Sequence, residues 1–314
     1  MSTTEDYLPP DQTSLFEPLR SDLRESYSRR DGLRFGRIFS EISARLSALK
    51  TAPTGNVLLQ TMRAWGSQGI PKMVLSRILD ECYQRCVGPH VAQLTGATES
   101  EAYGELTLPI LYEMFIAARL TSDCLFMDLG CGVGTATAQA SLQTGCRSYG
   151  IEKRSAAFEI AKTLQAELKI RCKMWGLKPG DMTLELGDML FSTQLKQLVR
   201  QADVILVNNY VFLPELSQAV CRILSTGLKD GARVITLSPL GFSVHSQASR
   251  SQVDRFPENI PFCITKHICP PGSFSWSATD GWYYLHEFTD SHRGESDDFL
   301  RRQRLPSHMM ARYL

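Results

Sequence analysis

Residues 124–153 read CLFMDLGCGVGTATAQASLQTGCRSYGIEK, and this stretch decides the fold. It begins with an apolar run, Leu125–Met127, and continues with three glycines at alternate positions, an Ala-rich segment and a short strand, Ser148–Ile151. Glycine is needed where a turn adopts positive φ or where the backbone approaches a ligand closely. A strand, a glycine-rich turn, a helix and a second strand ending in an acid are typical of the first βαβ unit of a doubly wound sheet.

The same alternation continues downstream. We expect further strands over Thr183–Leu186, Val204–Val207 and Arg233–Leu237, and helices over Ala156–Trp175, Thr193–Gln201 and Leu216–Leu228. Strands separated by helices predict a parallel sheet with right-handed crossovers. β-branched and aromatic residues over Cys263–Glu287 suit a closing antiparallel hairpin. The predicted fold is therefore α/β and Rossmann-like, with a doubly wound and mostly parallel sheet.

The first hundred residues carry a different pattern. Residues 1–30 are polar and contain proline, which favours a partly disordered lead-in. Over residues 31–100 apolar side chains recur at spacings of three and four, among them Ile38, Ile42 and Leu46, which predicts a helical N-terminal domain. Residues 101–314 then form the α/β domain.

Composition excludes several classes of protein. No apolar run approaches the roughly 20 residues that span a bilayer, and the acidic, polar start of the chain does not resemble a secretory signal. The 34 Lys and Arg residues nearly balance the 33 Asp and Glu residues, and a net charge of +1 argues against strong non-specific binding to nucleic acid. Nine scattered cysteines lack the paired spacing of a zinc site, so we expect reduced thiols in an intracellular protein.

Two acids accompany the glycine-rich turn. Asp128 closes the first strand, beside Gly130 and Gly132, and Glu152 closes the second. A carboxylate at the end of the second strand can accept hydrogen bonds from both ribose hydroxyls of a nucleoside cofactor. Asp128 can meet a positively charged methionine end, so we interpret the turn as a site for S-adenosyl-L-methionine.

Two later motifs extend the predicted site. Asp188 and Met189 follow the third strand, where a carboxylate can accept from an adenine amino group and a thioether can pack on the ring. Asn208 and Asn209 follow the fourth strand, at the sheet edge where open α/β folds bind ligands. An amide oxygen can hold a substrate amine without adding charge.

Five blocks, in order, resemble the disruptor-of-telomeric-silencing (Dot-one) family of histone H3 lysine methyltransferases, which have a class I methyltransferase fold and not a SET domain. The blocks are Tyr103–Leu106, Phe126–Gly134, Tyr149–Lys153, Val207–Phe212, and Ser275–Trp276 with Tyr283–His286. Three departures stand out. Thr135 occupies a position where the family pattern has Gln or Asn, Tyr210 replaces a Phe, and no Lys/Arg-rich arm is present.

The resemblance implies a role for each matched residue. The methionine part of the cofactor lies under Tyr103 and Glu105 and over the glycine motif, which supplies Asp128, Gly130, Gly132 and Thr135. Glu152 holds the ribose, and Asp188 with Met189 holds the adenine. The substrate lysine reaches the methyl group through a narrow channel shaped by Asn208, Phe212, Trp276 and Tyr283. Burial in such a channel lowers the pKa of the lysine, which must lose a proton before it can attack.

The resemblance also implies a partner and a location, namely histone H3 in nucleosomes and the nucleus. Two modest basic stretches suit a weak DNA contact through Arg29, Arg30, Arg301, Arg302 and Arg304, and their small charge favours a helper subunit. Two other hypotheses stay open. The chain is a divergent class I methyltransferase for another protein or a small molecule, or it is a non-catalytic chromatin-associated module.

Overall fold

The computed structural model describes residues 17–51, 69–94, 104–240 and 262–288, and the structural statements below concern these residues. The chain divides into two compact units. The smaller unit contains residues up to Ile78 together with Cys172–Lys178, and the larger unit contains Leu79–Arg171 and the chain after Lys178. By this division residues 79–94 belong to the larger unit, and the expected domain boundary near residue 100 stays a prediction.

The smaller unit begins with two helices, α3 (Glu17–Ser28) and α4 (Gly32–Thr51). Leu19 and Leu23, one helical turn apart on α3, pack on Ile38 and Ile42 of α4. The Asp31 side chain accepts a hydrogen bond from the Arg34 backbone N–H at 2.9 Å and so caps the start of α4. Residues 17–28 of the expected lead-in are therefore helical, because apolar residues at helical spacing bury against a second helix.

Helix α6 (Lys72–Cys86) is followed by a short 3-10 turn, η1 (Gly88–His90), and by α7 (Val91–Leu94). All described elements between residues 31 and 94 are helical, as the sequence predicts. Within the larger unit α6 is tied to α10 (Ser155–Met174), since Glu81 forms an ion pair with Arg171 at 3.1 Å. The Tyr83 hydroxyl donates to the Glu105 carboxylate at 2.7 Å.

The larger unit contains the predicted sheet. Its seven strands lie in the order β3-β2-β1-β4-β5-β7-β6. Their bounds are Leu125–Leu129 (β1), Arg147–Glu152 (β2), Met182–Leu186 (β3), Val204–Val207 (β4), Arg233–Thr236 (β5), Phe262–Cys269 (β6) and Gly281–Phe288 (β7). Strands β1 to β5 pair in parallel, whereas β7 runs antiparallel to both β5 and β6. The expected doubly wound, mostly parallel sheet and its closing hairpin are confirmed.

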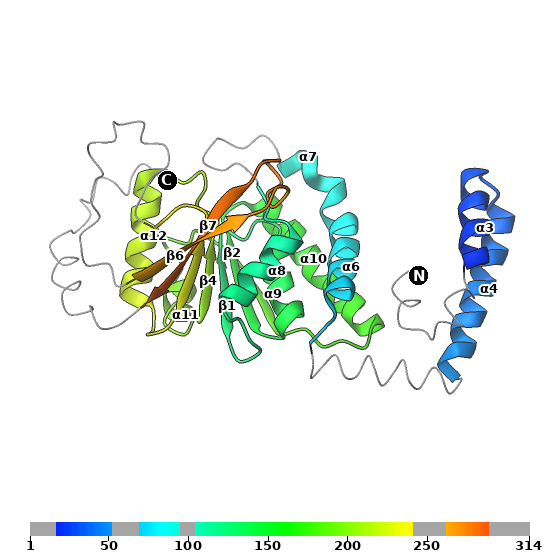
Figure 1. The fold of residues 1–314 in the computed structure, drawn as a ribbon, viewed down its shortest axis with the longest axis horizontal. Helices are drawn as coiled ribbons and strands as arrows, with labels where there is room; N and C mark the ends of the chain where they lie inside the picture. Colours follow the sequence, from blue (N-terminus) through cyan, green and yellow to red (C-terminus); the bar gives the residue numbers. More distant parts are fainter. Residues whose placement is uncertain (1–16, 52–68, 95–103, 241–261, 289–314) are drawn as a thin grey trace. The chain divides into compact units, whose positions relative to one another are not determined.

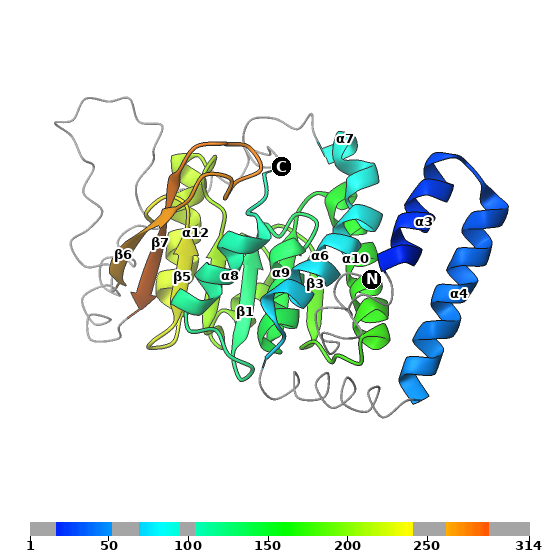
Figure 2. The ribbon, with the colours of Figure 1, turned by 45° about the vertical axis from the view of Figure 1, so that its right-hand side comes forward.

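Helices cover both faces of this sheet (Figures 1 and 2). On one face α8 (Leu108–Ala117) and α9 (Thr135–Thr144) pack on side chains of β1, β4 and β5. On the other face α11 (Thr193–Leu198) and α12 (Pro214–Gly227) bury the opposite side chains of the same strands. Because strands alternate their side chains, Phe126 faces α8 while Met127 faces α11 and α12. No helix in the described ranges is long and apolar enough to cross a membrane.

The order of the strands determines where a ligand-binding crevice can form. Chain connections run outward from β1 through β2 to β3, and then return to β4 on the other side of β1. Such a reversal leaves a crevice at the carboxyl ends of the two central strands, because the helices after them pack on opposite faces. Asp128, Glu152 and Asn208 all lie at or just after the carboxyl ends of β1, β2 and β4.

Candidate functional site

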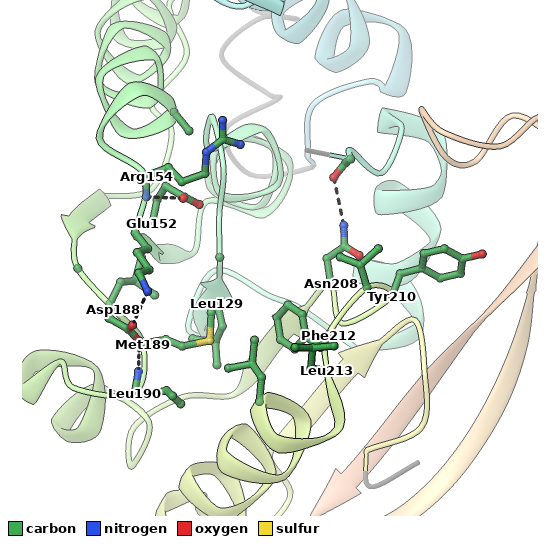
Figure 3. Close-up of a pocket in the computed structure, with 18 of the residues that line it drawn as sticks. Leu129, Glu152, Arg154, Asp188, Met189, Leu190, Asn208, Tyr210, Phe212 and Leu213 are labelled. Atoms are coloured by element: carbon green, nitrogen blue, oxygen red, sulfur yellow. Dashed lines mark hydrogen bonds and ion pairs between the residues drawn. The ribbon is translucent and has the colours of Figure 1, made fainter. Parts of the chain in front are cut away.

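A pocket of about 390 Å³ opens at the carboxyl ends of β1, β2, β3 and β4. Figure 3 shows residues from these strand ends pointing toward one space. Eight of the residues that the sequence motifs single out line this pocket: Gly104, Gly130, Glu152, Asp188, Met189, Asn208, Phe212 and Trp276. Its remaining walls are largely apolar, with Leu129, Leu213 and Leu216 among them.

The glycine-rich turn has the backbone that its sequence predicts. Gly130, Gly132 and Gly134 have φ values of 85°, 54° and 80°, a region that glycine enters without steric cost. The amides of this turn are already engaged. Gly130 and Cys131 both donate to the Ile151 carbonyl at 2.9 Å, and Gly132 donates to Glu152 Oε2 at 2.9 Å. The turn therefore has few backbone donors left for a phosphate group.

Glu152 is fixed at the end of β2 and is only 8% exposed. Its Oε1 accepts from the Arg154 backbone N–H at 2.7 Å, and its Oε2 accepts from Gly132. Figure 3 shows the first of these bonds at the pocket wall. A carboxylate oxygen can accept more than one hydrogen bond, so Glu152 retains capacity for a ligand's hydroxyl groups.

Asp188 and Met189 lie across the pocket from the Asn208 side (Figure 3). Asp188 Oδ2 pairs with Lys153 Nζ at 3.3 Å, and Oδ1 accepts from the Leu190 backbone N–H at 2.9 Å. A methyl group built on Gly130 would lie 3.6 Å from Met189 Cε, so the thioether packs directly on the turn. Lys153 was part of a sequence motif, but only the fold brings its ammonium group to Asp188.

A smaller cavity of about 50 Å³ adjoins the turn on the side of β1, and Glu105, Asp128 and Thr135 line it. Gly104, Gly130 and Asn208 line both this cavity and the larger pocket. Burial, and to a smaller extent the nearby Glu152 carboxylate, raise the pKa of Asp128 to about 7. The Thr137 hydroxyl, 3.4 Å from Asp128 Oδ2, opposes that shift by donating to the ionised form. Two carboxylates at one small cavity favour a cationic ligand.

The adjacent asparagines after β4 have different tasks. Asn209 is 3% exposed, and its amide joins β4 to the chain after β5. Its Nδ2 donates to the Ser238 carbonyl at 2.9 Å, and its Oδ1 accepts from the Leu237 and Ser238 backbone N–H groups at 3.0 and 2.9 Å. Asn209 is thus a structural residue, and only Asn208 faces the pocket.

Asn208 turns its nitrogen toward the loop before α8. Nδ2 donates to the Gly104 carbonyl at 3.1 Å, and because a carbonyl can only accept, this bond fixes which end of the amide points there. Oδ1 is thereby directed elsewhere, and no described residue donates to it. The predicted acceptor for a substrate amine therefore has a free lone pair at the boundary of the two cavities.

Two of the predicted aromatic residues reach the pocket. Phe212 lines its wall, and Trp276 packs against Tyr210 with ring centroids 5.6 Å apart. Trp276 also covers Gly104, since a methyl group there would lie 2.5 Å from its Cε3. The pocket thus carries an aromatic side formed by the fourth strand end and the turn between β6 and β7.

Tyr283 lines neither of these two cavities, and its expected place in a substrate channel stays a prediction. It is 3% exposed, belongs to the core under α8, and stacks on His267 with ring centroids 4.7 Å apart. The reason is the alternation of side chains along β7, which directs Tyr283 into the core. Tyr103 lies outside the described residues.

Other pocket residues were missed at the level of sequence. Arg154, Leu213 and Leu216 line the large pocket but belong to no recognisable pattern. Tyr83, which contacts Glu105, is only one apolar position of α6 in the sequence. No group of His, Cys, Asp and Glu side chains suited to a metal ion occurs among the described residues.

Comparison with known proteins gives a consistent set of relatives. The family model described as histone methylation protein DOT1 matches residues 83–288. A histone-lysine N-methyltransferase, H3 lysine-79 specific, from Chaetomium globosum is 36% identical over 218 residues, which cover 68% of this chain and 41% of that protein. An enzyme of the same description from Emericella nidulans is 28% identical over 294 residues, covering 90% and 56%.

The chain spans about half the length of the curated relatives it matches. Among solved structures, an O-methyltransferase from Bacillus cereus in complex with SAH is similar at 12% identity and a TM-score of 0.47. That similarity covers 73% of this chain and all of the other.

Proposed function

The chain belongs to the family of the histone methylation protein DOT1, and from this premise we propose that it is a lysine N-methyltransferase that uses S-adenosyl-L-methionine and acts on histone H3 in nucleosomes. One observation carries the proposal. Glu152, the Asp188–Met189 pair and Asn208 line one pocket, which opens at the switch point of a doubly wound sheet. The matched relatives that are named H3 lysine-79 specific support the choice of substrate.

The engaged amides of the glycine-rich turn favour this cofactor over a dinucleotide. A pyrophosphate needs backbone N–H groups at such a turn. Here Gly130, Cys131 and Gly132 donate within the protein, to Ile151 and Glu152. S-adenosyl-L-methionine has no phosphate, so it does not need the backbone N–H groups that are engaged here.

The carboxylates match the rest of the cofactor. Glu152 would accept from the ribose hydroxyls, and Asp188 with Met189 would hold the adenine, which is supported by the presence of all three residues in the pocket wall. Glu105 and Asp128 line the smaller cavity and suit the ammonium group of the methionine part. When bound, the cofactor supplies a methyl group activated on a positively charged sulfur.

The other residues prepare the lysine. An ammonium group has no lone pair, so it must release its proton to solvent before its nitrogen can form a bond to carbon. Apolar surroundings lower the pKa of a lysine because they disfavour its charged form, and Phe212 and Trp276 supply such surroundings. The free Oδ1 of Asn208 can accept a hydrogen bond from the amine and orient its lone pair. No protein nucleophile is required.

The proposed partners follow from the proposed substrate. We place the protein at chromatin in the nucleus, with nucleosomal histone H3 as its partner. Arg29 and Arg30 are exposed and suit a weak DNA contact, whereas Arg301, Arg302 and Arg304 lie outside the described residues. The low net charge of +1 supports a helper subunit that adds affinity for nucleosomes.

Methyl transfer from radiolabelled S-adenosyl-L-methionine to reconstituted nucleosomes, free histones and a whole-cell protein extract tests the proposal. We expect label on nucleosomal H3. Gly130→Arg should abolish transfer, because Gly130 has positive φ and lies at the pocket wall. Gly36→Arg is the matched control, since its Cβ would meet no atom within 4 Å.

Asn208→Ala separates the substrate role from the cofactor role. It should slow transfer by about tenfold or more, because it removes a hydrogen-bonding group worth roughly 1.4 kcal/mol, and should weaken cofactor binding less. Label only in the extract would retain the chemistry and change the substrate. Absence of cofactor binding by calorimetry would favour the non-catalytic module.

A further inference from the structure

The Glu105 carboxylate is held at both of its oxygens. The Tyr83 hydroxyl donates to Oε2 at 2.7 Å, and the Thr135 hydroxyl donates to Oε1 at 2.9 Å. Tyr83 comes from α6, Thr135 is the first residue of α9, and Glu105 lies in the loop before α8. Three segments distant in sequence therefore converge on one carboxylate.

The backbone of Glu105 is fixed as well. Its N–H donates to Ser275 Oγ at 2.9 Å, and its carbonyl accepts from the Ser275 N–H at 2.9 Å. Leu106 forms a bridge with Phe274 in the same turn between β6 and β7. With its backbone attached to this turn, the Glu105 side chain has little freedom beyond its own rotamers, and the two hydroxyls restrict those.

Glu105 is placed where a ligand would meet it. Together with Thr135 and Asp128 it lines the cavity of about 50 Å³ beside the glycine-rich turn. Tyr83 lines neither this cavity nor the larger pocket, so it can act on a ligand only through Glu105. Burial, then the hydrogen bond to Glu105, raise the pKa of Tyr83 far above its ordinary value, so the phenol remains a proton donor throughout the physiological range.

We propose that Tyr83 and Thr135 are positioning residues that orient the Glu105 carboxylate toward the ammonium group at the methionine end of the cofactor. The inference rests on the proposed function and deepens it. It also gives a role to Thr135, which occupies a position where the family pattern has Gln or Asn. The Thr135 side chain is directed at Glu105, so it contributes to the cofactor site through that carboxylate. A carboxylate that is oriented before binding loses less conformational entropy when the cation arrives.

Calorimetric affinities for two ligands test this role. S-adenosyl-L-methionine carries the methionine end, and 5′-methylthioadenosine lacks it. We expect Tyr83→Phe and Thr135→Val each to raise the Kd of the first ligand about three- to tenfold, as expected when an ordered side chain becomes mobile. The Kd of 5′-methylthioadenosine should change less than about twofold, and Thr135→Ser, which keeps the hydroxyl, should resemble wild type.

The controls test whether each variant folds and whether the effect of Tyr83 on affinity passes through Glu105. Tyr27→Phe and Thr163→Val remove the same groups at exposed positions of other helices and should leave both affinities unchanged. Thermal unfolding checks that each variant folds. In a Glu105→Gln background, Tyr83→Phe should add little, because its effect passes through the carboxylate.

Three results would overturn the inference. They are an unchanged affinity for S-adenosyl-L-methionine in both single variants, an equal loss for both ligands, and full additivity with Glu105→Gln. Wild-type protein that binds neither ligand would overturn the proposed function, and this inference with it. Wild-type protein that binds both while Tyr83→Phe and Thr135→Val bind equally well would overturn this inference alone.

Discussion

The charge of Asp128 depends strongly on its surroundings. It is 4% exposed, and burial raises its pKa to about 7, from about 3.9 in an unfolded chain. The folded protein therefore binds a proton that the unfolded chain has released between these two pH values. Stability from this group is fully present below about pH 4 and is lost as pH rises through about 7.

The variant Asp128→Asn tests the direction in which Asp128 makes stability depend on pH. Without ligand, the free energy of unfolding of the wild type should fall relative to the variant by up to about 4 kcal/mol between pH 4 and pH 8. Denaturant unfolding at pH 4 and pH 8 measures the difference. Asp280→Asn, at an exposed carboxylate of the turn before β7, is the matched control and should retain the wild-type pH dependence. Parallel stability curves for wild type and Asp128→Asn would contradict the prediction.

The two asparagines after β4 show what sequence leaves undecided at this scale. Both amides follow the same buried strand, and both are the same residue type. Only the position of β5 allows the Asn209 side chain to join β4 to the chain after β5, through three hydrogen bonds to Leu237 and Ser238. Only the position of the loop before α8 directs Nδ2 of Asn208 to the Gly104 carbonyl, so that no described residue donates to Oδ1.

At the scale of elements, the loop before α8 and the turn between β6 and β7 behave as one structure. Residues 105–107 exchange backbone hydrogen bonds with residues 273–275, and Leu106 bridges Phe274. Trp276 lies directly on Gly104, and both residues line the large pocket. The aromatic side of the pocket and the loop that carries Glu105 are therefore positioned together.

Gly104→Ala should disturb this contact. Its new methyl group would lie 2.5 Å from Trp276 Cε3, so the ring must move, and overpacking of this kind costs roughly 1–3 kcal/mol. We expect a lower melting temperature and slower methyl transfer. Thermal unfolding and initial rates measure both effects.

A second variant tests whether the loss of stability comes from the contact between the new methyl group and the Trp276 ring. In a Trp276→Ala background, Gly104→Ala should cost little further stability, because the ring that it would meet is absent, while transfer stays slow. Gly36→Ala, whose Cβ meets no atom within 4 Å, should leave transfer unchanged. A double variant less stable than the sum of the two single changes would argue against the collision.

At the scale of the whole molecule, the charge balance would limit the proposed binding to nucleosomes. The net charge is +1. Some of the N-terminal arginines are already paired, since Arg29 lies 2.7 Å from Glu25 and Arg34 lies 2.9 Å from both Asp22 and Glu25. Such exposed pairs are weak individually, but they reduce the positive charge that remains for phosphate groups.

The salt dependence of the affinity for nucleosomes measures how many phosphate contacts the protein makes. With about two phosphate contacts, affinity for nucleosomes should fall only about tenfold between 50 and 200 mM salt, whereas six to ten contacts would cost about 10³- to 10⁵-fold. Arg29→Ser with Arg30→Ser should flatten the dependence further, and Arg45→Ser, an arginine in an i,i+4 pair with Glu41, is the control. A slope as steep as that of a polybasic protein would contradict the prediction.

The sequence by itself determined the architecture of the larger unit. The glycine-rich turn, the strand-helix alternation and the acids at strand ends predict the parallel sheet, its hairpin and the carboxyl-edge site. They succeed because periodicity and backbone requirements are local. Composition said less about residues 17–28, which are polar on average yet form α3, whose Leu19 and Leu23 pack on α4.

Only the tertiary structure decided which side chains meet. Tyr83 and Thr135 reach Glu105 from two other segments of the chain, and no spacing along the chain encodes that contact. Tyr283 shares a motif with residues near the site, yet the pleat of β7 directs it into the core. Hydrogen bonds and ring contacts depend on distances of a few ångströms between elements, and those distances are set by how helices and strands pack and not by the order of residues.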